Sequence, residues 1–174
     1  MVPGVLHPPR VYRNLPPACF LSAGAVPMWA GCCIGFGTVF SHPTAESGND
    51  VYVGILCTIG AGTLEDDVLV SSHVSIINGG RQHGIERLDI PVREQIGEWR
   101  HITIGRDTWV GERSTIMADV GKHCVIGASS VVTRPIPDYA IAVGCPARVV
   151  RFRDRMIEQD RGPIQAPVNA VSKT

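Results

Sequence analysis

The sequence predicts an all-β chain that winds as a parallel β-helix. Nineteen glycines, thirteen prolines and only 6% aromatic residues in 174 favour a chain rich in turns over a helical bundle. From Ile34 onward, aliphatic residues recur about every six positions, and glycine often follows them. A period of six fits neither an α-helix nor an isolated strand, but it fits short strands joined by tight turns that stack as coils. Three such hexads make one coil of about eighteen residues.

The repeat can be followed residue by residue. The aliphatic residue of each hexad is expected to point into the prism, and the small residue after it is expected to turn a corner, because glycine accepts backbone angles that a Cβ would forbid. No coil buries its own face alone, so several stacked coils are needed for stability. The expected inward positions are Ile34, Phe40, Val53, Ile59, Leu64, Val70, Ile76, Ile104, Val110, Ile116, Val120, Ile126 and Val132.

Segments without the repeat divide the chain. Residues 1–33 form an irregular, proline-rich N-terminal segment in which the phase of any leading coils stays open, and residues 34–134 form the β-helix domain. Residues 135–174 form a C-terminal module and tail, with a short helix expected across 151–160. Inside the β-helix domain, the 27 residues 77–103 have no regular pattern. A loop of that length in a compact domain is more often functional than idle.

Composition and charge exclude several classes of function. With 44% hydrophobic and 18% charged residues the chain is expected to fold. Sixteen basic residues balance sixteen acidic ones, which argues against a nucleic-acid partner. Residues 18–37 carry no charge, but Pro27 and four glycines interrupt them, so no membrane span is expected. The six cysteines show neither a CxxC pair nor a disulfide framework, which favours a reducing compartment and predicts a cytoplasmic protein.

Several motifs together resemble the hexapeptide-repeat acyltransferases, over about residues 34–153. They are the hexads, the mid-chain loop with a histidine, the stretch 104–111 (IGRDTWVG), and the ending from 131–137 (VVTRPIP) to 144–150 (GCPARVV). The sequence is most similar to the sugar and polysaccharide O-acetyltransferases. This resemblance implies a left-handed β-helix, acetyl-CoA as co-substrate, and a homotrimer with its sites between subunits. The sequence departs from that of the maltose and galactoside enzymes at Leu56 or Cys57, where those enzymes carry a polar residue that contacts the sugar.

The loop carries His83, in the stretch 78–84 (NGGRQHG), where the resemblance implies a catalytic histidine. A hydroxyl is a weak nucleophile near neutral pH until a base takes its proton, and an imidazole with a reference pKa of about 6.5 suits that task. A catalytic histidine usually has a partner that fixes its tautomer. Glu86, Asp89 and Glu94 are the candidates by proximity, and Glu86 ranks first.

His101 and His123 are expected to be structural, His73 is expected to be a turn or wall residue with contact to the acceptor as the alternative, and no metal is expected. A γ-class carbonic anhydrase, which shares the repeat, would need three metal-binding histidines, two of them closely spaced. The spacings of His73, His83, His101 and His123 do not reproduce that pattern.

The resemblance also implies a groove for acetyl-CoA. Trp109 matches an aromatic position near the pantetheine arm, and a backbone N–H at Gly111 or Glu112 is expected to donate to the oxyanion. Arg134 and Arg148 suit phosphate because a guanidinium gives charge-assisted hydrogen bonds. The residues matched to this groove are Trp109, Gly111, Glu112, Ala128, Ser129, Thr133, Arg134 and Arg148, with Arg151 and Arg153 as further candidates.

The sequence therefore predicts an acetyl-CoA-dependent transfer of an acetyl group to a saccharide hydroxyl, with His83 as general base. Two alternatives stay open. An amino-sugar N-acetyltransferase would use the same machinery, and a non-catalytic β-helix scaffold would use none of it. One sequence does not decode the loops that choose an acceptor.

Overall fold

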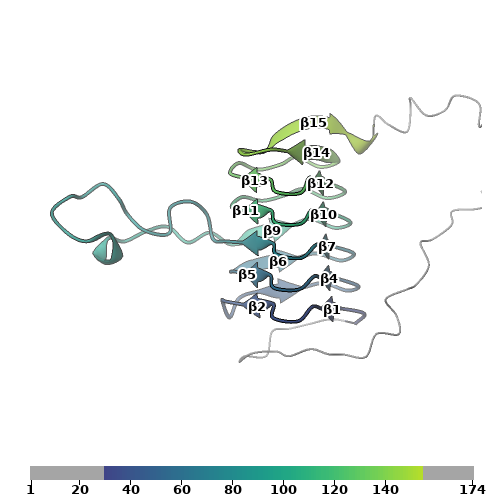
Figure 1. Ribbon diagram of the computed structural model, residues 1–174, viewed down its shortest axis with the longest axis horizontal. Coiled ribbons are helices and arrows are strands. Elements are labelled where there is room, and N and C mark those ends of the chain that lie inside the picture. Colours follow the sequence, from purple (N-terminus) through teal and green to yellow (C-terminus); the bar gives the residue numbers. More distant parts are fainter. Residues whose placement is uncertain (1–29, 155–174) are drawn as a thin grey trace, which may run out of the picture.

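The computed structural model describes residues 30–154, which wind as a three-sided prism of stacked coils (Figure 1). The coils run from β1 (Cys33–Ile34) at one end to β14 (Ala140–Val143) and β15 (Arg148–Phe152) at the other. Most strands have only two residues, so each is held mainly by hydrogen bonds to the coils before and after it. The prediction of an all-β chain of stacked parallel coils is confirmed.

The strands form three sheets, one on each side of the prism. Strand pairing is parallel throughout, except that β15 is antiparallel to β14 at the end of its sheet. Sheet A contains β1, β4 (Tyr52–Val53), β7 (Leu69–Val70), β10 (Trp109–Val110), β12 (Val125–Ile126), β14 and β15. Sheet B contains β2 (Val39–Phe40), β5 (Thr58–Ile59), β8 (Ser75–Ile76), β11 (Thr115–Ile116) and β13 (Val131–Val132). Sheet C contains β3 (Glu46–Ser47), β6 (Gly62–Leu64) and β9 (Ile102–Ile104), and single bridges at Val120 and Ile136 continue it.

The core is the set of inward positions that the hexads predict. All of them are buried except Phe40, which is half-buried against the core. The parallel register keeps equivalent positions aligned, so that Val53 pairs with Val70 and Val70 with Val110. One inward position is polar and escapes the pattern: Ser47 in β3 is 2% exposed. Stacked aliphatic columns therefore account for most of the apolar burial.

The corners do not turn in the predicted way. The turns from sheet C to sheet A and from sheet A to sheet B pass through residues with positive φ, which are Gly31 and Gly37 in the first coil and residues other than glycine in the later coils. The hexad glycines Gly105 and Gly111 lie outside the positive-φ region, so the prediction that they supply unusual backbone angles is wrong. Close packing requires them instead, because a Cβ would lie 2.5 Å from the Lys122 nitrogen at position 105 and 2.6 Å from the Ala128 nitrogen at position 111. The positive-φ residues other than glycine are Asp50, Asp67, Asp107, His123 and Tyr139 at one corner and Leu56, His73, Arg113 and Ser129 at the other.

Strand pairing continues beyond residue 134. Ile136 bridges to Val120, and β14 pairs with β12, so the last coil uses residues of the predicted C-terminal module. Of the predicted helix across 151–160, Arg151 and Phe152 belong to β15, and only Arg153 and Asp154 are helical within the described residues. Pairing with β14 satisfies the backbone of Arg151 and Phe152 as strand, and residues 155–160 lie outside the described part of the chain. Across residues 30–154, no helix is long and apolar enough to cross a membrane.

Candidate functional site: the arm between β8 and β9

The long aperiodic segment projects from the side of the prism as an arm, defined here as residues 77–101 (Figure 1). The arm leaves sheet B after β8 and returns to sheet C at β9, which begins at Ile102, two residues earlier than the predicted end of the loop. It contains one turn of 3-10 helix, η1 (Val92–Glu94). The arm therefore takes the place of the turn at the corner between sheets B and C.

A buried asparagine ties both ends of the arm to the prism. The Asn78 side chain is 3% exposed, and its Nδ2 donates to the carbonyl oxygens of Ala61 (2.7 Å) and Arg100 (2.8 Å). Its Oδ1 accepts from the backbone N–H of Ala61 at 3.1 Å. The backbone N–H of Arg100 in turn donates to the carbonyl oxygen of Asn78 at 3.1 Å. One amide thus joins the outgoing limb, the returning limb and the neighbouring coil.

A second amide organises the tip. Gln95 is buried, and its Nε2 donates to the carbonyl oxygens of Arg87 (2.7 Å) and Ile90 (3.3 Å). Its Oε1 accepts from the backbone N–H of Arg87 at 3.1 Å. The arm is therefore held at its base and at its tip by side-chain amides, whereas the coils of the prism are held together by repeated backbone hydrogen bonds.

His83 lies between these two amides, where the limbs of the arm run side by side. The backbone N–H of Glu98 donates to the carbonyl oxygen of Arg81 at 2.6 Å, and that of Gly84 reaches the carbonyl oxygen of Gln95 at 3.5 Å. The His83 side chain is exposed, and it has no side-chain hydrogen bond to any other described residue. The imidazole is therefore accessible to a substrate.

The structure gives the candidate partners of His83 other contacts. Glu86 Oε2 accepts from the backbone N–H of Ile85 at 2.9 Å. Backbone hydrogen bonds lower the pKa of Glu86, with a smaller contribution from the charge of Arg81, so the side chain is a stable carboxylate. Asp89 pairs with Arg87, and Glu94 lies 3.5 Å from Arg93. Contact with His83 is shown for none of these three carboxylates.

The residues matched to the cofactor groove fall on separate edges of the prism. Gly111 and Glu112 follow β10 at the corner between sheets A and B, and Ala128 and Ser129 occupy the same corner one coil later, where the Ser129 N–H donates to the Glu112 carbonyl oxygen at 2.8 Å. Trp109 lies on the outer side of sheet A, 50% exposed. Thr133 and Arg134 follow β13 at the corner between sheets B and C, the corner that carries the arm two coils earlier, and Arg148 begins β15. The structure therefore brings together four of the eight residues matched to the groove, those at the corner between sheets A and B. His83 lies on a different edge of the prism from these four.

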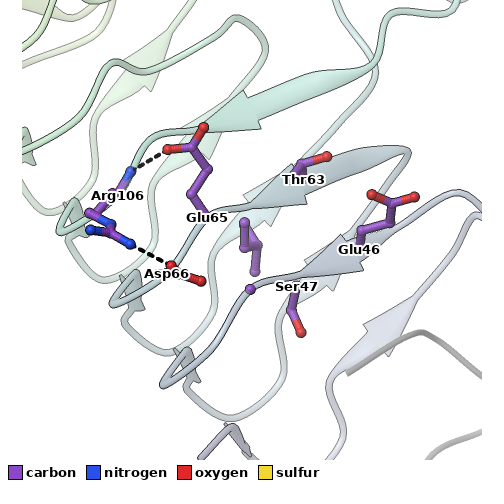
Figure 2. A pocket seen from close by; sticks show the side chains of 8 residues that line it. Glu46, Ser47, Thr63, Glu65, Asp66 and Arg106 are labelled. Carbon is purple, nitrogen blue, oxygen red and sulfur yellow. Dashed lines mark hydrogen bonds and ion pairs between the residues drawn. The ribbon is translucent and has the colours of Figure 1, made fainter. Parts of the chain in front are cut away.

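An acidic groove on sheet C has no counterpart in the sequence prediction (Figure 2). It has a volume of about 380 Å³ and lies across the first three coils. Arg106 closes one side: its backbone N–H donates to Glu65 Oε2 at 2.9 Å, and its guanidinium bonds Asp66 at 2.5 Å. The backbone N–H of Asn49, and then Arg106, lower the pKa of Asp66. Glu46 comes from one coil, Glu65 and Asp66 from the next and Arg106 from the one after, so only the register of sheet C could have revealed the groove.

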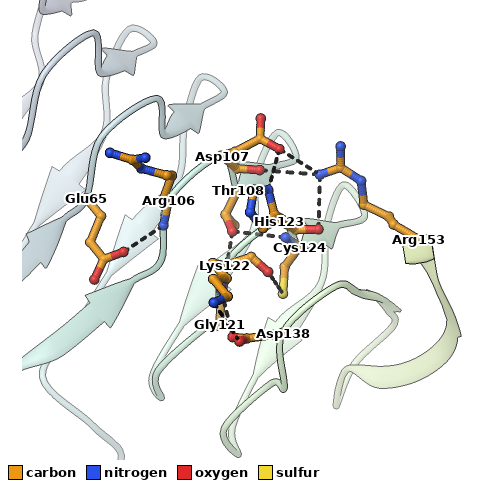
Figure 3. Close-up of polar contacts among 10 residues, drawn as sticks. All are labelled: Glu65, Arg106, Asp107, Thr108, Gly121, Lys122, His123, Cys124, Asp138 and Arg153. Carbon is orange, nitrogen blue, oxygen red and sulfur yellow. Dashed lines mark hydrogen bonds and ion pairs between the residues drawn. The ribbon is translucent and has the colours of Figure 1, made fainter.

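Two of the remaining histidines make structural contacts, as predicted. His123 Nδ1 lies 2.9 Å from Asp107 Oδ2 (Figure 3). The ring of His123 also stacks on that of Tyr139, with centroids 5.1 Å apart. Arg153, a further candidate for binding phosphate, instead donates to the His123 carbonyl oxygen at 3.0 Å and lies 3.3 Å from Asp107. His101 Nε2 lies 2.8 Å from Thr63 Oγ1. Within residues 30–154, no group of three His, Cys, Asp or Glu side chains could hold a metal ion.

Comparison with known proteins supplies the family. No protein-family model matches the sequence. The chain is 35% identical over 96 residues to galactoside O-acetyltransferase of Escherichia coli, which covers 51% of this chain and 43% of that protein. It is 32% identical over 119 residues to serine acetyltransferase of Haemophilus influenzae, covering 67% and 36%. The solved structure of a galactoside acetyltransferase in complex with coenzyme A matches with a TM-score of 0.65 and 26% identity, over 76% of this chain and 67% of that chain.

The homologues and structural neighbours are acetyltransferases, and one neighbour with the same fold is named a hexapeptide-repeat acetyltransferase, so the resemblance predicted from the sequence is confirmed. The fold class, a left-handed parallel β-helix, is confirmed with it. The chain spans only 36% and 43% of the length of the two curated relatives compared.

Proposed function

We propose that the protein is an acetyltransferase that moves an acetyl group from acetyl-CoA to a hydroxyl of a saccharide. The observation that carries the proposal is an exposed histidine on an arm that projects from a β-helix whose relatives are acetyltransferases. A galactoside O-acetyltransferase stands among the relatives, and a galactoside acetyltransferase bound to coenzyme A among the solved structures. Both support a sugar acceptor and a CoA thioester donor.

His83 is the proposed general base. It takes the proton of the acceptor hydroxyl as the hydroxyl oxygen attacks the thioester carbonyl carbon, and a backbone N–H at Gly111 or Glu112 donates to the resulting oxyanion. The tetrahedral intermediate then expels the thiolate as the C–S bond breaks, and the imidazolium returns its proton to the sulfur. Glu86 is the proposed orienting partner, and it would have to reach the ring after a change in its present contact with Ile85.

Direct transfer suits the cysteines of the chain. Burial raises the pKa of both Cys57 and Cys124, and each thiol donates to a backbone carbonyl oxygen, so neither is a ready nucleophile. The five described cysteines are free thiols, which supports the proposed cytoplasmic location.

The proposed cofactor groove runs along the later coils. Trp109 provides an exposed aromatic face for the pantetheine arm, and Gly111, Glu112, Ala128 and Ser129 provide closely stacked backbone at one corner. Arg134 and Arg148, both exposed, are the proposed phosphate ligands, with Thr133 beside them.

A homotrimer is proposed because one chain separates the parts of this site. His83 lies on the arm from the corner between sheets B and C, whereas Gly111 and Ser129 lie at the corner between sheets A and B. A second copy that presents its sheet A edge to the arm would unite them, and closed assembly by rotation favours a ring. The arm also exposes large apolar side chains that a neighbour could cover: Ile85, Leu88, Val92, Ile96 and Trp99.

The acceptor is proposed to be a neutral saccharide unit of a polysaccharide under construction. An amino sugar is the second candidate, and the carboxylates of the groove on sheet C favour it over an anionic sugar. A catalytically silent scaffold is the third, and it predicts no turnover at all.

The test is thiol release from acetyl-CoA with neutral saccharides, amino sugars and serine as acceptors, by the wild type and by His83→Ala. Acceptor-dependent release that falls by about 10²-fold or more in His83→Ala supports the general base. His73→Asn is the matched control: His73 is exposed at a corner with φ of 58°, an angle that asparagine tolerates. Full activity in His83→Ala would transfer the role of base to another residue, and a wild type without thiol release would favour the scaffold.

A further inference from the structure

The two limbs of the arm pass in close contact at Gln82 and His83, and a glycine makes that contact possible. A Cβ on Gly97 would lie 2.1 Å from the carbonyl oxygen of Gln82 and 2.4 Å from the backbone nitrogen of His83. Both of these are backbone atoms, so no side-chain rotation could relieve the contact. Gly97 does not have a positive φ, and the requirement for glycine here is therefore one of space alone.

Glycine also stands on the opposite limb at the same point. A Cβ on Gly84 would lie 2.8 Å from the carbonyl oxygen of Ile96 and 3.0 Å from Gln95 Cβ. The residues around this crossing are held in register by the contacts of Arg81 with Glu98 and of Gly84 with Gln95. Asn78 and Gln95 fix the arm on either side of it. The limbs cannot slide apart freely, so the thickness of the returning limb at Gly97 sets the backbone position of His83.

We infer that Gly97 is a positioning residue for His83: it lets the returning limb pass directly behind the histidine and so fixes where the imidazole lies. The inference rests on the proposed function of His83 as general base. Opening the contact from 2.1 Å to the 3.4 Å of an ordinary van der Waals contact requires the limbs to move apart by more than 1 Å, and a misplacement of about 1 Å can cost on the order of 10²-fold in rate. Gly97 lies in the arm, outside the prism, so the coils should keep their stability.

The arm offers a matched control. Gly80 lies on the outgoing limb only three residues before His83, is exposed, and does not have a positive φ. A Cβ there would have a single near neighbour, the flexible Cε end of Met117 at 3.1 Å. The same substitution at positions 97, 84 and 80 therefore gives a graded series: a severe backbone contact, a moderate one and a soft one.

The experiment compares Gly97→Ala, Gly84→Ala and Gly80→Ala for thiol release, acetyl-CoA affinity and thermal unfolding. We expect kcat to fall by about 10- to 100-fold in Gly97→Ala, by less in Gly84→Ala and by under twofold in Gly80→Ala, with acetyl-CoA affinity and unfolding temperature preserved in all three. Adding Gly97→Ala to His83→Ala should cause no further loss, because two changes that act through one group are not additive. A Gly97→Ala enzyme with full activity, or one whose loss persists undiminished in the His83→Ala background, would overturn the inference.

A spectroscopic readout keeps the positioning role separate from the chemistry. In NMR spectra of protein labelled with ¹³C at the histidine ring carbons, the signal that disappears in His83→Ala identifies His83. That signal should shift in Gly97→Ala and stay in place in Gly80→Ala, whether or not the acceptor is known. An unmoved signal in Gly97→Ala would refute the positioning role even if the enzyme were inactive, whereas a shifted signal beside a fully active His83→Ala would refute only the assignment of His83 as base.

Discussion

The prism and the arm are built on different principles, although one continues directly into the other. In the prism, each backbone N–H of a strand finds the same partner one coil away, and aliphatic side chains repeat at aligned positions. In the arm, order depends on single side chains, with Asn78 at the base and Gln95 at the tip, and on a glycine where the limbs cross. A repeated structure tolerates the loss of one contact within a cooperative stack, but a structure held at three points does not.

The difference suits a division of labour. A stack of coils offers fixed edges along which an extended cofactor can lie, and its rigidity comes from burial. An arm can carry a base to the edge of a neighbouring copy, because its length is free of the period. The predictions that follow test whether stability resides in the prism and positioning in the arm.

The largest expected effect is on stability, from a core substitution in the prism. Ile116 is fully buried in β11, and Ile116→Ala removes apolar contacts that neighbouring coils cannot replace. We expect the free energy of unfolding to fall by about 2–5 kcal/mol, measured by denaturant titration. The adjacent outward residue gives the control, since Thr115→Ala should change it by about 0.5 kcal/mol or less. A loss below about 1 kcal/mol in Ile116→Ala would mean that the column of aliphatic residues is not the main source of stability.

The next effect is expected at the base of the arm. Asn78→Ala leaves the buried N–H and carbonyl of Ala61 without their side-chain partner, at a cost of about 1–3 kcal/mol. Trypsin cleavage at Arg81, Arg87 and Arg93, all exposed, reports the opening of the arm directly. We expect cleavage at these arginines to accelerate about tenfold or more, because the free energy of opening the arm falls by about 1–3 kcal/mol, the contribution of the lost contacts.

Gln95→Ala is the counterpart that separates base from tip. It should accelerate cleavage at Arg87 and Arg93 while the unfolding temperature stays close to that of the wild type, since its partners all lie within the arm. If Asn78→Ala left cleavage unchanged, the base of the arm would be held by the backbone alone, and the contrast with the prism would disappear.

The sequence predicted the prism far better than the arm, for a physical reason. In a periodic structure, every coil requires an aliphatic side chain at the same inward position. Val53, Ile59 and their equivalents therefore identified the inward face, although Ser47 was missed. Periodicity could not show that Gly111 is needed for close packing and not for its backbone angle, because both requirements select the same residue.

The arm has no repeat from which to infer a contact. The resemblance predicts His83, but the crossing of His83 with Gly97 depends on thirteen residues of intervening chain returning to the same point. The acidic groove on sheet C escaped for a similar reason, because Glu46 and Arg106 are brought together by coil stacking and lie far apart in the sequence. The same holds for a site shared between copies, where one chain supplies only part of the geometry.

The smallest expected effect concerns pH and lies at a corner of the prism, where Asp66 joins Asn49 of one coil to Arg106 of another. The folded pKa of Asp66 is lowered, first by the Asn49 N–H and then by Arg106, so the folded state favours the carboxylate. Its stabilisation is therefore present above the unfolded value of about 4 and is lost as the pH falls through the lower folded pKa. Asp66→Asn should slightly lower the unfolding temperature at pH 7, and the difference from wild type should vanish in acid. Because the Asp66–Arg106 pair is exposed, added salt at pH 7 should also reduce the difference in unfolding temperature between wild type and Asp66→Asn. A corner held chiefly by charge would show this salt dependence, and a corner held by the Asn49 hydrogen bond would not. An Asp66→Asn protein with an unchanged unfolding temperature at pH 7 would assign the corner to backbone pairing alone, and the prism would then owe its shape to its repeat at the corners as well as in the core.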